Sequence, residues 1–233
     1  MRPPIERWDV AAVVQPLLGG HRNLAFRTQG LSRNLVFKST RRTTAAIHWL
    51  VQVQQIARQS GFVVPEMLES CNGQLVDEGW TCETHVEGVP FAPDEMPTIR
   101  PLISRFHSAT TDVPQRPGFL SSKALLDNVS GGDVDLVAMP TELASRCRRK
   151  WRAVSDRKEA VIHGDLNSGN LIRCLDGRAA LIDWDECRRD LILFDLVPLG
   201  EGDEDERKAC LAWEVACSWL VEPDYAKAVA TQL

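Results

Sequence analysis

The chain carries a polar segment in which a histidine, aspartates and an asparagine lie around a pair of apolar runs. His163, Asp165 and Asn170 precede the apolar runs, and Asp183 and Asp185 follow them. Carboxylate and amide oxygens are the ligands that hard cations such as Mg²⁺ prefer. The residue types in this segment therefore predict a site for such a cation.

The two apolar runs, on either side of Asp176-Gly177, predict a β-hairpin. Asp-Gly is a strong signal for a two-residue type I′ turn, and in that register Asn170 lies directly opposite Asp183. Opposed residues have Cβ atoms about 4.5–5.5 Å apart, so both side chains can reach one Mg²⁺ ion.

The run H-G-D-x-x-x-x-N from His163 to Asn170, followed by I-D-W at Asp183, resembles the catalytic and metal-binding segments of the aminoglycoside phosphotransferase and choline kinase superfamily. These proteins are relatives of the protein kinases. The resemblance implies that Asp165 orients the acceptor hydroxyl and accepts its proton, and that Asn170 and Asp183 hold Mg²⁺. Each pattern alone is common by chance, so the prediction depends on their combination. On this reasoning, a hairpin shifted by a single residue, or side chains that point to separate places, would overturn the kinase interpretation.

By the same resemblance, the chain of 233 residues has an α+β, two-lobed protein-kinase-like fold. A small antiparallel-sheet lobe over residues 1–84 binds the nucleotide, and residues 85–90 form the hinge. Residues 91–233 form a mainly helical lobe for catalysis and acceptor binding. Two residues are expected to be structural: His107 as a core or capping residue of a helix, and Asp195 as a brace for the catalytic loop, residues 163–170.

Lys38 ends a strand-like segment ahead of a helix and resembles the lysine that contacts nucleotide phosphates in kinase-like folds. A glycine-containing turn before it can cradle phosphate oxygens through backbone amides. Residues near the end of the small lobe are expected to lie beside the adenine. The further residues predicted to bind nucleotide are Gly20, His21, Asn23, Glu83 and His85.

One feature departs from the family pattern, in which a glutamate of the next helix pairs with the lysine. The helix expected over residues 43–59 contains no aspartate or glutamate. Either another carboxylate, such as Glu66, supplies the counter-charge, or Lys38 is positioned without one. The departure leaves open a catalytically silent pseudokinase that binds nucleotide or a protein partner.

Composition limits the classes of partner and compartment. A formal net charge of −5 argues against nucleic acid, because binding to its backbone needs clustered basic residues. The 7 cysteines have no metal-binding spacing, which predicts reduced thiols and a cytoplasmic location. No signal peptide or membrane span is recognisable, so no membrane partner is expected.

The resemblance therefore implies a phosphotransferase that moves the γ-phosphoryl group of ATP or GTP, with Mg²⁺, to a hydroxyl of a small molecule. Asp185 and Glu186 are expected to contact this acceptor. An aminoglycoside or other antibiotic, a choline-like alcohol, a sugar and an amino acid remain alternatives, since function depends on the acceptor site and not on the fold. A metal-dependent hydrolase is a weaker alternative, and the oligomeric state is open.

Overall fold

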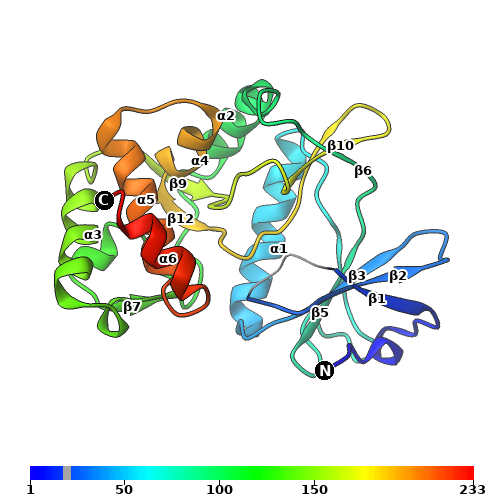
Figure 1. The fold of residues 1–233 in the computed structure, drawn as a ribbon. Coiled ribbons are helices and arrows are strands. Elements are labelled where there is room, and N and C mark those ends of the chain that lie inside the picture. The colour runs from blue at the N-terminus through cyan, green and yellow to red at the C-terminus, as the bar shows by residue number, and fades with distance from the viewer. Residues whose placement is uncertain (18–21) are drawn as a thin grey trace.

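A computed structural model describes residues 1–17 and 22–233. Gly20 and His21, which we expected to bind nucleotide, lie outside the described residues. A sheet-rich lobe carries the N-terminus and a helical lobe carries the C-terminus (Figure 1). The strands are β1 Val13–Leu17, β2 Ala25–Gln29, β3 Leu35–Ser39, β4 Met67–Leu68, β5 Trp80–Thr84, β6 Gly88–Pro90, β7 Ser130–Gly131, β8 Val134–Asp135, β9 Glu159–Ile162, β10 Leu171–Cys174, β11 Ala179–Leu181 and β12 Arg188–Leu191. The helices are α1 Thr44–Gln59, α2 Arg100–Ala109, α3 Thr141–Ala153, α4 Leu193–Leu196, α5 Glu204–Ser218 and α6 Pro223–Ala230.

The small lobe is built on a five-stranded antiparallel sheet in the order β1-β2-β3-β5-β4. β5 is buried along its whole length because β3 and β4 flank it in the interior of the sheet. Trp8, from the short helical turn before β1, packs edge-on against Phe37 of β3, with ring centroids 5.5 Å apart. This aromatic packing covers β3, the strand that carries Lys38. Lys38 pairs with Thr81 of β5, two residues from the buried Glu83.

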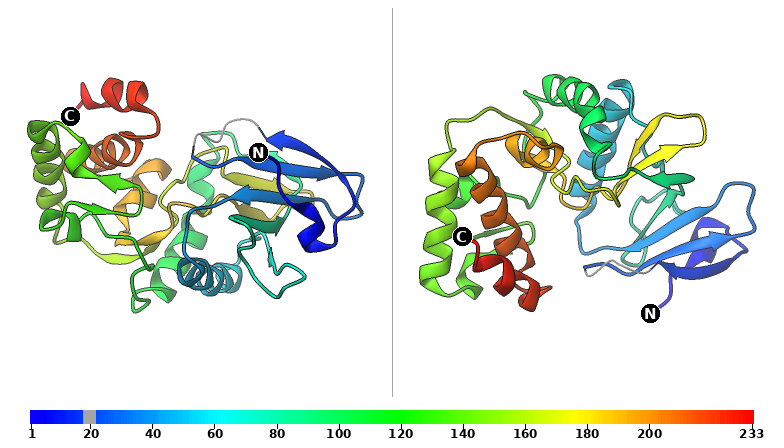
Figure 2. Two further views of the ribbon diagram at one scale, coloured as in Figure 1. Left: turned by 90° about the horizontal axis from the view of Figure 1, so that it is seen from below. Right: turned by 45° about the horizontal axis from the view of Figure 1, so that its top comes forward.

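α1 lies between the sheet and the large lobe (Figures 1 and 2). Thr43 caps its first turn, because the Thr43 side chain accepts a hydrogen bond from the backbone N–H of Ala46 at 3.2 Å. Trp49, Leu50 and Val53 form its buried face and join the core cluster that also contains residues of α2 and of the catalytic segment. The helix predicted over residues 43–59 is therefore confirmed, and it links the two lobes.

The β10–β11 hairpin forms, but the predicted register is wrong by one residue. Leu171 pairs with Leu181, and the turn contains three residues, from Leu175 to Gly177. Gly177 has φ 82°, whereas Asp176 is not left-handed, so the turn is not type I′. Asp-Gly also suits a three-residue loop that ends in a left-handed glycine, and this second solution is the one adopted.

In the large lobe, α3 and α5 pack around a core that contains Trp151 and Trp213, whose ring centroids are 6.0 Å apart. Asp203 and Glu206 form a reciprocal capping box at the start of α5, which explains the acidic residues at this position. β9 and β12 form a separate antiparallel pair that ends where the catalytic loop begins. Within the described residues, no helix is long and apolar enough to span a membrane.

Candidate active site

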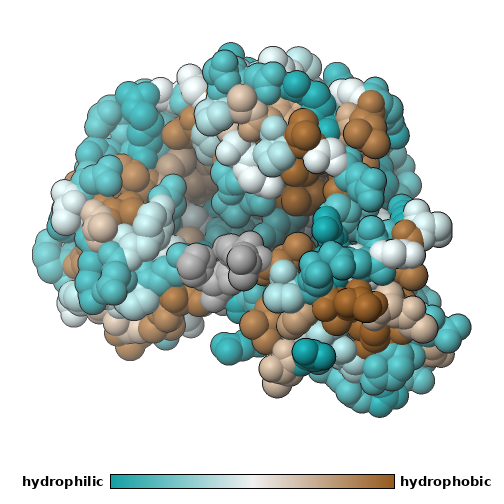
Figure 3. Space-filling view, turned by 45° about the vertical axis from the view of Figure 1, so that its right-hand side comes forward, coloured by the Kyte–Doolittle hydropathy of each residue, from teal (hydrophilic) through white to brown (hydrophobic). Residues whose placement is uncertain are grey.

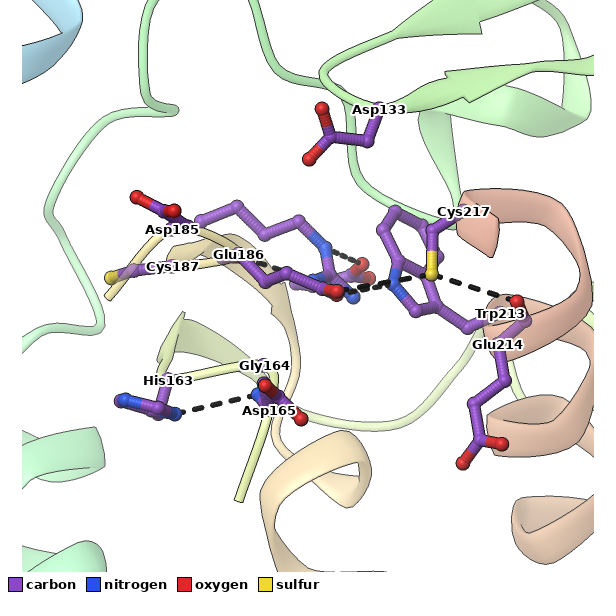
Figure 4. A network of polar contacts seen from close by, with 12 residues as sticks. Asp133, His163, Gly164, Asp165, Asp185, Glu186, Cys187, Trp213, Glu214 and Cys217 are labelled. Carbon is purple, nitrogen blue, oxygen red and sulfur yellow. Dashed lines mark hydrogen bonds and ion pairs between the residues drawn. The ribbon is translucent and has the colours of Figure 1, made fainter. Parts of the chain in front are cut away.

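A cavity of about 480 Å³ lies where the two lobes meet. The surface is hollowed between the lobes in the space-filling view of Figure 3. The small lobe contributes Asn23 and Lys38 to the walls, and the catalytic loop contributes Asp165. Figure 4 shows further acidic side chains gathered here from different elements of the large lobe. The cavity therefore contains several of the predicted site residues.

The catalytic loop is held in place by Asp195, a fully buried residue of α4. Its carboxylate accepts hydrogen bonds from the backbone N–H groups of His163 and Gly164 and from the ring of His107, each at 2.9 Å. Burial alone would raise the pKa of Asp195, but the contacts with His107 and the loop lower it. The predicted brace role of Asp195 and the structural role of His107 are both confirmed.

Asp165 is an exposed residue in the wall of the cavity. Its carboxylate accepts hydrogen bonds from Asn167 Nδ2 and Asn170 Nδ2, each at 2.9 Å. Desolvation by the surrounding protein, together with the negative charge of Glu186, raises the pKa of Asp165 to about 6. A carboxylate with a raised pKa in a cleft has the properties of a general base that works near neutral pH.

Asn170 and Asp183 both lie near Asp165, but they are not the cross-strand pair that the predicted register required. Asn170 faces Ile182 and not Asp183, since its C=O accepts from the backbone N–H of Ile182 at 3.0 Å. Asp183 lies beyond β11 and has φ 58°, a left-handed conformation that is uncommon for non-glycine residues. This backbone conformation, and not a cross-strand pairing, directs the Asp183 carboxylate into the cavity.

Two charged neighbours act on the Asp183 carboxylate. Lys38 Nζ lies 3.4 Å from Asp183 Oδ1, and this ammonium group lowers the pKa of Asp183. The negative charge of Asp183 also contributes to the raised pKa of Asp165. The structure therefore brings Lys38, Asp165, Asn170 and Asp183 together, although Asn170 and Asp183 are not cross-strand partners.

Glu83 of β5 supplies the counter-charge that the α1 sequence lacks. Lys38 Nζ lies 3.1 Å from Glu83 Oε1, and both side chains are largely buried. Lys38 faces Thr81 across the sheet, so Glu83 is its diagonal neighbour on the same face, within reach of a long side chain. Glu66, the alternative weighed from the sequence, instead pairs with Arg33 at 3.3 Å on the exposed surface.

Burial by itself would lower the pKa of Lys38, but the carboxylates of Glu83, Asp183 and Asp185 outweigh it and raise this pKa. The ammonium group therefore stays charged, as a lysine that contacts phosphate oxygens must. Glu83 was expected to contact the nucleotide, whereas its carboxylate contacts Lys38. The glutamate that positions the lysine comes from a strand instead of a helix.

Other predicted nucleotide ligands lie in different surroundings. Asn23 donates a hydrogen bond from Nδ2 to the Asp185 carboxylate, so it bridges the two lobes within the cavity. His85 follows β5, and its Nε2 lies 3.5 Å from Nη1 of Arg27. His85 is not among the described residues that line the cavity, so its proposed contact with the base of a nucleotide stays a prediction.

Asp185 and Glu186, the predicted acceptor ligands, both line the cavity. Burial raises the pKa of Asp185, and the nearby Asp183 carboxylate adds to this effect. Glu186 accepts a hydrogen bond from Trp213 Nε1 of α5 at 3.2 Å. The structure therefore places these two acids in the cavity, and their contact with an acceptor stays a prediction.

Asn167, which the sequence motifs did not indicate, organises the catalytic loop. Its Oδ1 accepts from the backbone N–H groups of Gly169 and Asn170, and its Nδ2 donates to Asp165. An asparagine that bonds to the backbone two residues further on is a common turn device, so its position before Gly169 was an available signal. Arg22 and Trp213 also line the cavity, but the motifs did not indicate them because both lie far from the catalytic loop in sequence.

The phosphotransferase enzyme family has a sequence model that matches residues 13–214 of the chain. Among curated proteins, no sequence matches at a significant level. The solved structures that resemble this one are distant in sequence but nearly complete in coverage.

Spectinomycin phosphotransferase APH(9)-Ia, solved with ADP and spectinomycin, is 10% identical with a TM-score of 0.61, over 97% of this chain and 86% of that one. Aminoglycoside phosphotransferase APH(4)-Ia, as a thermostable mutant without ligand, is 13% identical with a TM-score of 0.62, over 98% and 97%. Choline kinase LicA from Streptococcus pneumoniae is 13% identical with a TM-score of 0.58, over 96% and 95%. These similarities confirm the two-lobed α+β kinase-like fold, and with the match over residues 13–214 they show that the chain belongs to the phosphotransferase enzyme family.

Proposed function

We propose that the protein transfers the γ-phosphoryl group of ATP or GTP to a hydroxyl group of a small molecule. Asp165 orients the hydroxyl and accepts its proton, and Lys38 binds the phosphate oxygens. One observation carries the proposal: Asp165 lies in the cavity between the lobes, bonded to Asn170 at 2.9 Å and beside Asp183. Phosphoryl transfer depends mainly on positioning and charge placement, which this cluster can supply.

Asn170 and Asp183 are the proposed magnesium ligands, and their chemistry fits this ion. The Asn170 amide nitrogen is engaged by Asp165, so the oxygen is the atom that it can offer to a cation. The low pKa of Asp183 keeps that carboxylate ionised. Asn170 and Asp183 would hold Mg²⁺, which would supply positive charge against the nucleotide phosphates.

The acceptor side of the cavity favours a cationic small molecule. Its described walls include Glu186, Glu214, Trp213 and Tyr225, which together offer negative charge and aromatic faces. The related structures include enzymes for spectinomycin and other aminoglycosides, and a choline kinase. An aminoglycoside is therefore the first acceptor to test, and a role in antibiotic resistance is the corresponding proposal.

Product identification tests the proposed function. The protein is incubated with Mg²⁺ and ATP or GTP over a panel of aminoglycosides, choline, sugars and amino acids, and products are identified by mass spectrometry. A phosphorylated acceptor supports the phosphotransferase. Nucleotide binding without any phosphorylated product would support the silent pseudokinase. That alternative was suggested by the lack of an acidic partner for Lys38 in α1, and Glu83 provides such a partner at 3.1 Å. Free phosphate without a phosphorylated acceptor would support the hydrolase.

Glu83→Gln is expected to lower kcat/KM for the nucleotide by roughly tenfold to a hundredfold, since small losses of positioning are costly in phosphoryl transfer. The variant removes the negative charge next to Lys38 but keeps the shape of the side chain. Lys38 then retains Asp183 as its ionic partner at 3.4 Å, so activity falls without being abolished. Steady-state kinetics with varied ATP measures the effect.

Glu66→Gln is the matched control, because the same charge is removed from an exposed pair with Arg33. Exposed ion pairs contribute about 0–1 kcal/mol, so kcat/KM should change by less than about threefold. Equal losses in the two variants would show that the contact between Lys38 and Glu83 has no special role.

The pH dependence of kcat/KM should have an acidic limb near pH 6. Asp165 must be ionised to accept a proton, and its raised pKa of about 6 means that activity falls roughly tenfold for each pH unit below this value. Glu186→Gln removes one charge that raises this pKa, so the limb should move to lower pH. A limb near pH 4 in the unmodified protein would contradict the assignment of Asp165.

A further inference from the structure

Arg22, in the small lobe between β1 and β2, extends into the acceptor side of the cavity. Its Nη1 forms an ion pair with Glu186 and lies 3.8 Å from Asp133 Oδ2, and its Nη2 donates to Cys217 Sγ at 3.3 Å. All three partners belong to the large lobe. The guanidinium group of one lobe is therefore enclosed by groups of the other.

The Glu186 carboxylate is built into the wall that receives this guanidinium. Its Oε2 accepts from Trp213 Nε1 at 3.2 Å and lies 4.0 Å from Arg188 Nη1, while its Oε1 faces Arg22. Only 12% of the Glu186 side chain is exposed. Figure 4 shows Glu186 extending toward Trp213 and Cys217, with Asp133 across the same space. These fixed contacts leave one carboxylate oxygen directed at a cation.

The cavity is acidic, and its two basic residues have different surroundings. Of the described residues that line it, Lys38 and Arg22 are the basic ones. Lys38 is engaged by Glu83 and Asp183 at the nucleotide side. Arg22 lies at the acceptor side, where it reaches the acidic group whose charge also acts on Asp165.

We propose that Glu186 and Asp133 form the binding site for one guanidinium or ammonium group of the acceptor, and that Arg22 occupies it until the acceptor displaces it. This inference deepens the proposed function and rests on it, because the bound cation is an acceptor only if the protein transfers a phosphoryl group. Arg22 is thus an internal competitor that imitates the substrate cation. Because Glu186 lies close enough to Asp165 to affect it, an acceptor cation bound here holds a neighbouring hydroxyl near the base.

The expected consequence is a gain of affinity when Arg22 is removed. The apparent affinity is proportional to the fraction of protein whose site is vacant. If Arg22 fills the site more than about nine-tenths of the time, Arg22→Gln should bind a cation at least about tenfold more tightly. Such a gain cannot arise from misfolding, which only weakens binding.

The test measures binding of agmatine, which carries a guanidinium and an ammonium group, by isothermal titration calorimetry without nucleotide. Arg22→Gln is expected to lower the Kd at least about tenfold. The double variant with Glu186→Gln should lose that gain, and butylurea, a neutral analogue, should not respond to either change. Because no turnover is measured, the result is independent of whether phosphotransfer occurs.

Arg42→Gln is the matched control. Arg42 also forms an ion pair with Asp133, at 2.5 Å. Among the contacts of the described residues, none joins Arg42 to Glu186. Loss of Arg42 releases Asp133 from one partner but leaves Arg22 on Glu186, so Arg42→Gln should bind agmatine more weakly than Arg22→Gln does. Equal tightening by Arg42→Gln, unchanged affinity in Arg22→Gln, or a gain that persists without Glu186 would each overturn the proposal.

Discussion

Replacing Asp165 with asparagine is expected to lower kcat by about a hundredfold to ten-thousandfold, the usual contribution of a general base. The amide keeps the size of the side chain and can still accept a hydrogen bond from Asn167 or Asn170, but it cannot take a proton from the acceptor. Nucleotide affinity should change little. Product formation on the acceptor identified by mass spectrometry, together with nucleotide titration, measures both effects.

Asp176→Asn provides the control for this prediction. Asp176 lies at the exposed tip of the β10–β11 hairpin and pairs locally with Arg178, so the same chemical change occurs outside the cavity. Its kcat should stay within about twofold of the unmodified value, as expected for a surface substitution. An Asp165→Asn protein that retains comparable activity would refute the role of Asp165 as the base.

Replacing Asp195 with alanine is expected to lower the free energy of unfolding by about 3 kcal/mol or more. His107 and the backbone N–H groups of His163 and Gly164 all donate to this fully buried carboxylate. Each buried donor left without a partner costs about 1–3 kcal/mol. The catalytic loop also loses its anchor, so phosphotransfer should fall together with stability. Urea unfolding followed by tryptophan fluorescence measures the stability.

Asp224→Ala is the control for Asp195→Ala. The Asp224 side chain is fully exposed, and within the described part of the chain its ion pair is with Lys227, at 3.4 Å. Its unfolding free energy should change by less than about 0.5 kcal/mol. Asp195→Asn should lie between the two, because an amide oxygen accepts some of the three hydrogen bonds. Similar unfolding curves for Asp195→Ala and Asp224→Ala would show that the brace is dispensable.

The hairpin shows where sequence patterns stop being decisive. Asp176-Gly177 identified the turn correctly, yet the same dipeptide fits a two-residue and a three-residue loop. The energies of the two loops depend on how β10 pairs with β6 and how β11 meets the rest of the core, which no local pattern contains. The left-handed backbone at Asp183 then directed its carboxylate to the cavity despite the shifted register.

The counter-charge of Lys38 shows the same limit at a larger scale. The absence of acids from α1 was visible in the sequence, but the remedy was not. Glu83 lies 45 positions after Lys38, and it becomes a neighbour only because β5 pairs with β3. The sequence of the next helix therefore contains no information about Glu83, which the sheet places beside Lys38.

By itself, the sequence predicted the helix over residues 43–59 from its apolar periodicity. Its motifs also carried the resemblance that implied the family, the two-lobed architecture and the brace at Asp195. Both depend on short patterns, which are properties of local segments. Only the tertiary structure decided the hairpin register, the partner of Lys38, and the position of Arg22 against Glu186. Those contacts join segments far apart in the chain, and their energies are set by which surfaces meet when the lobes pack.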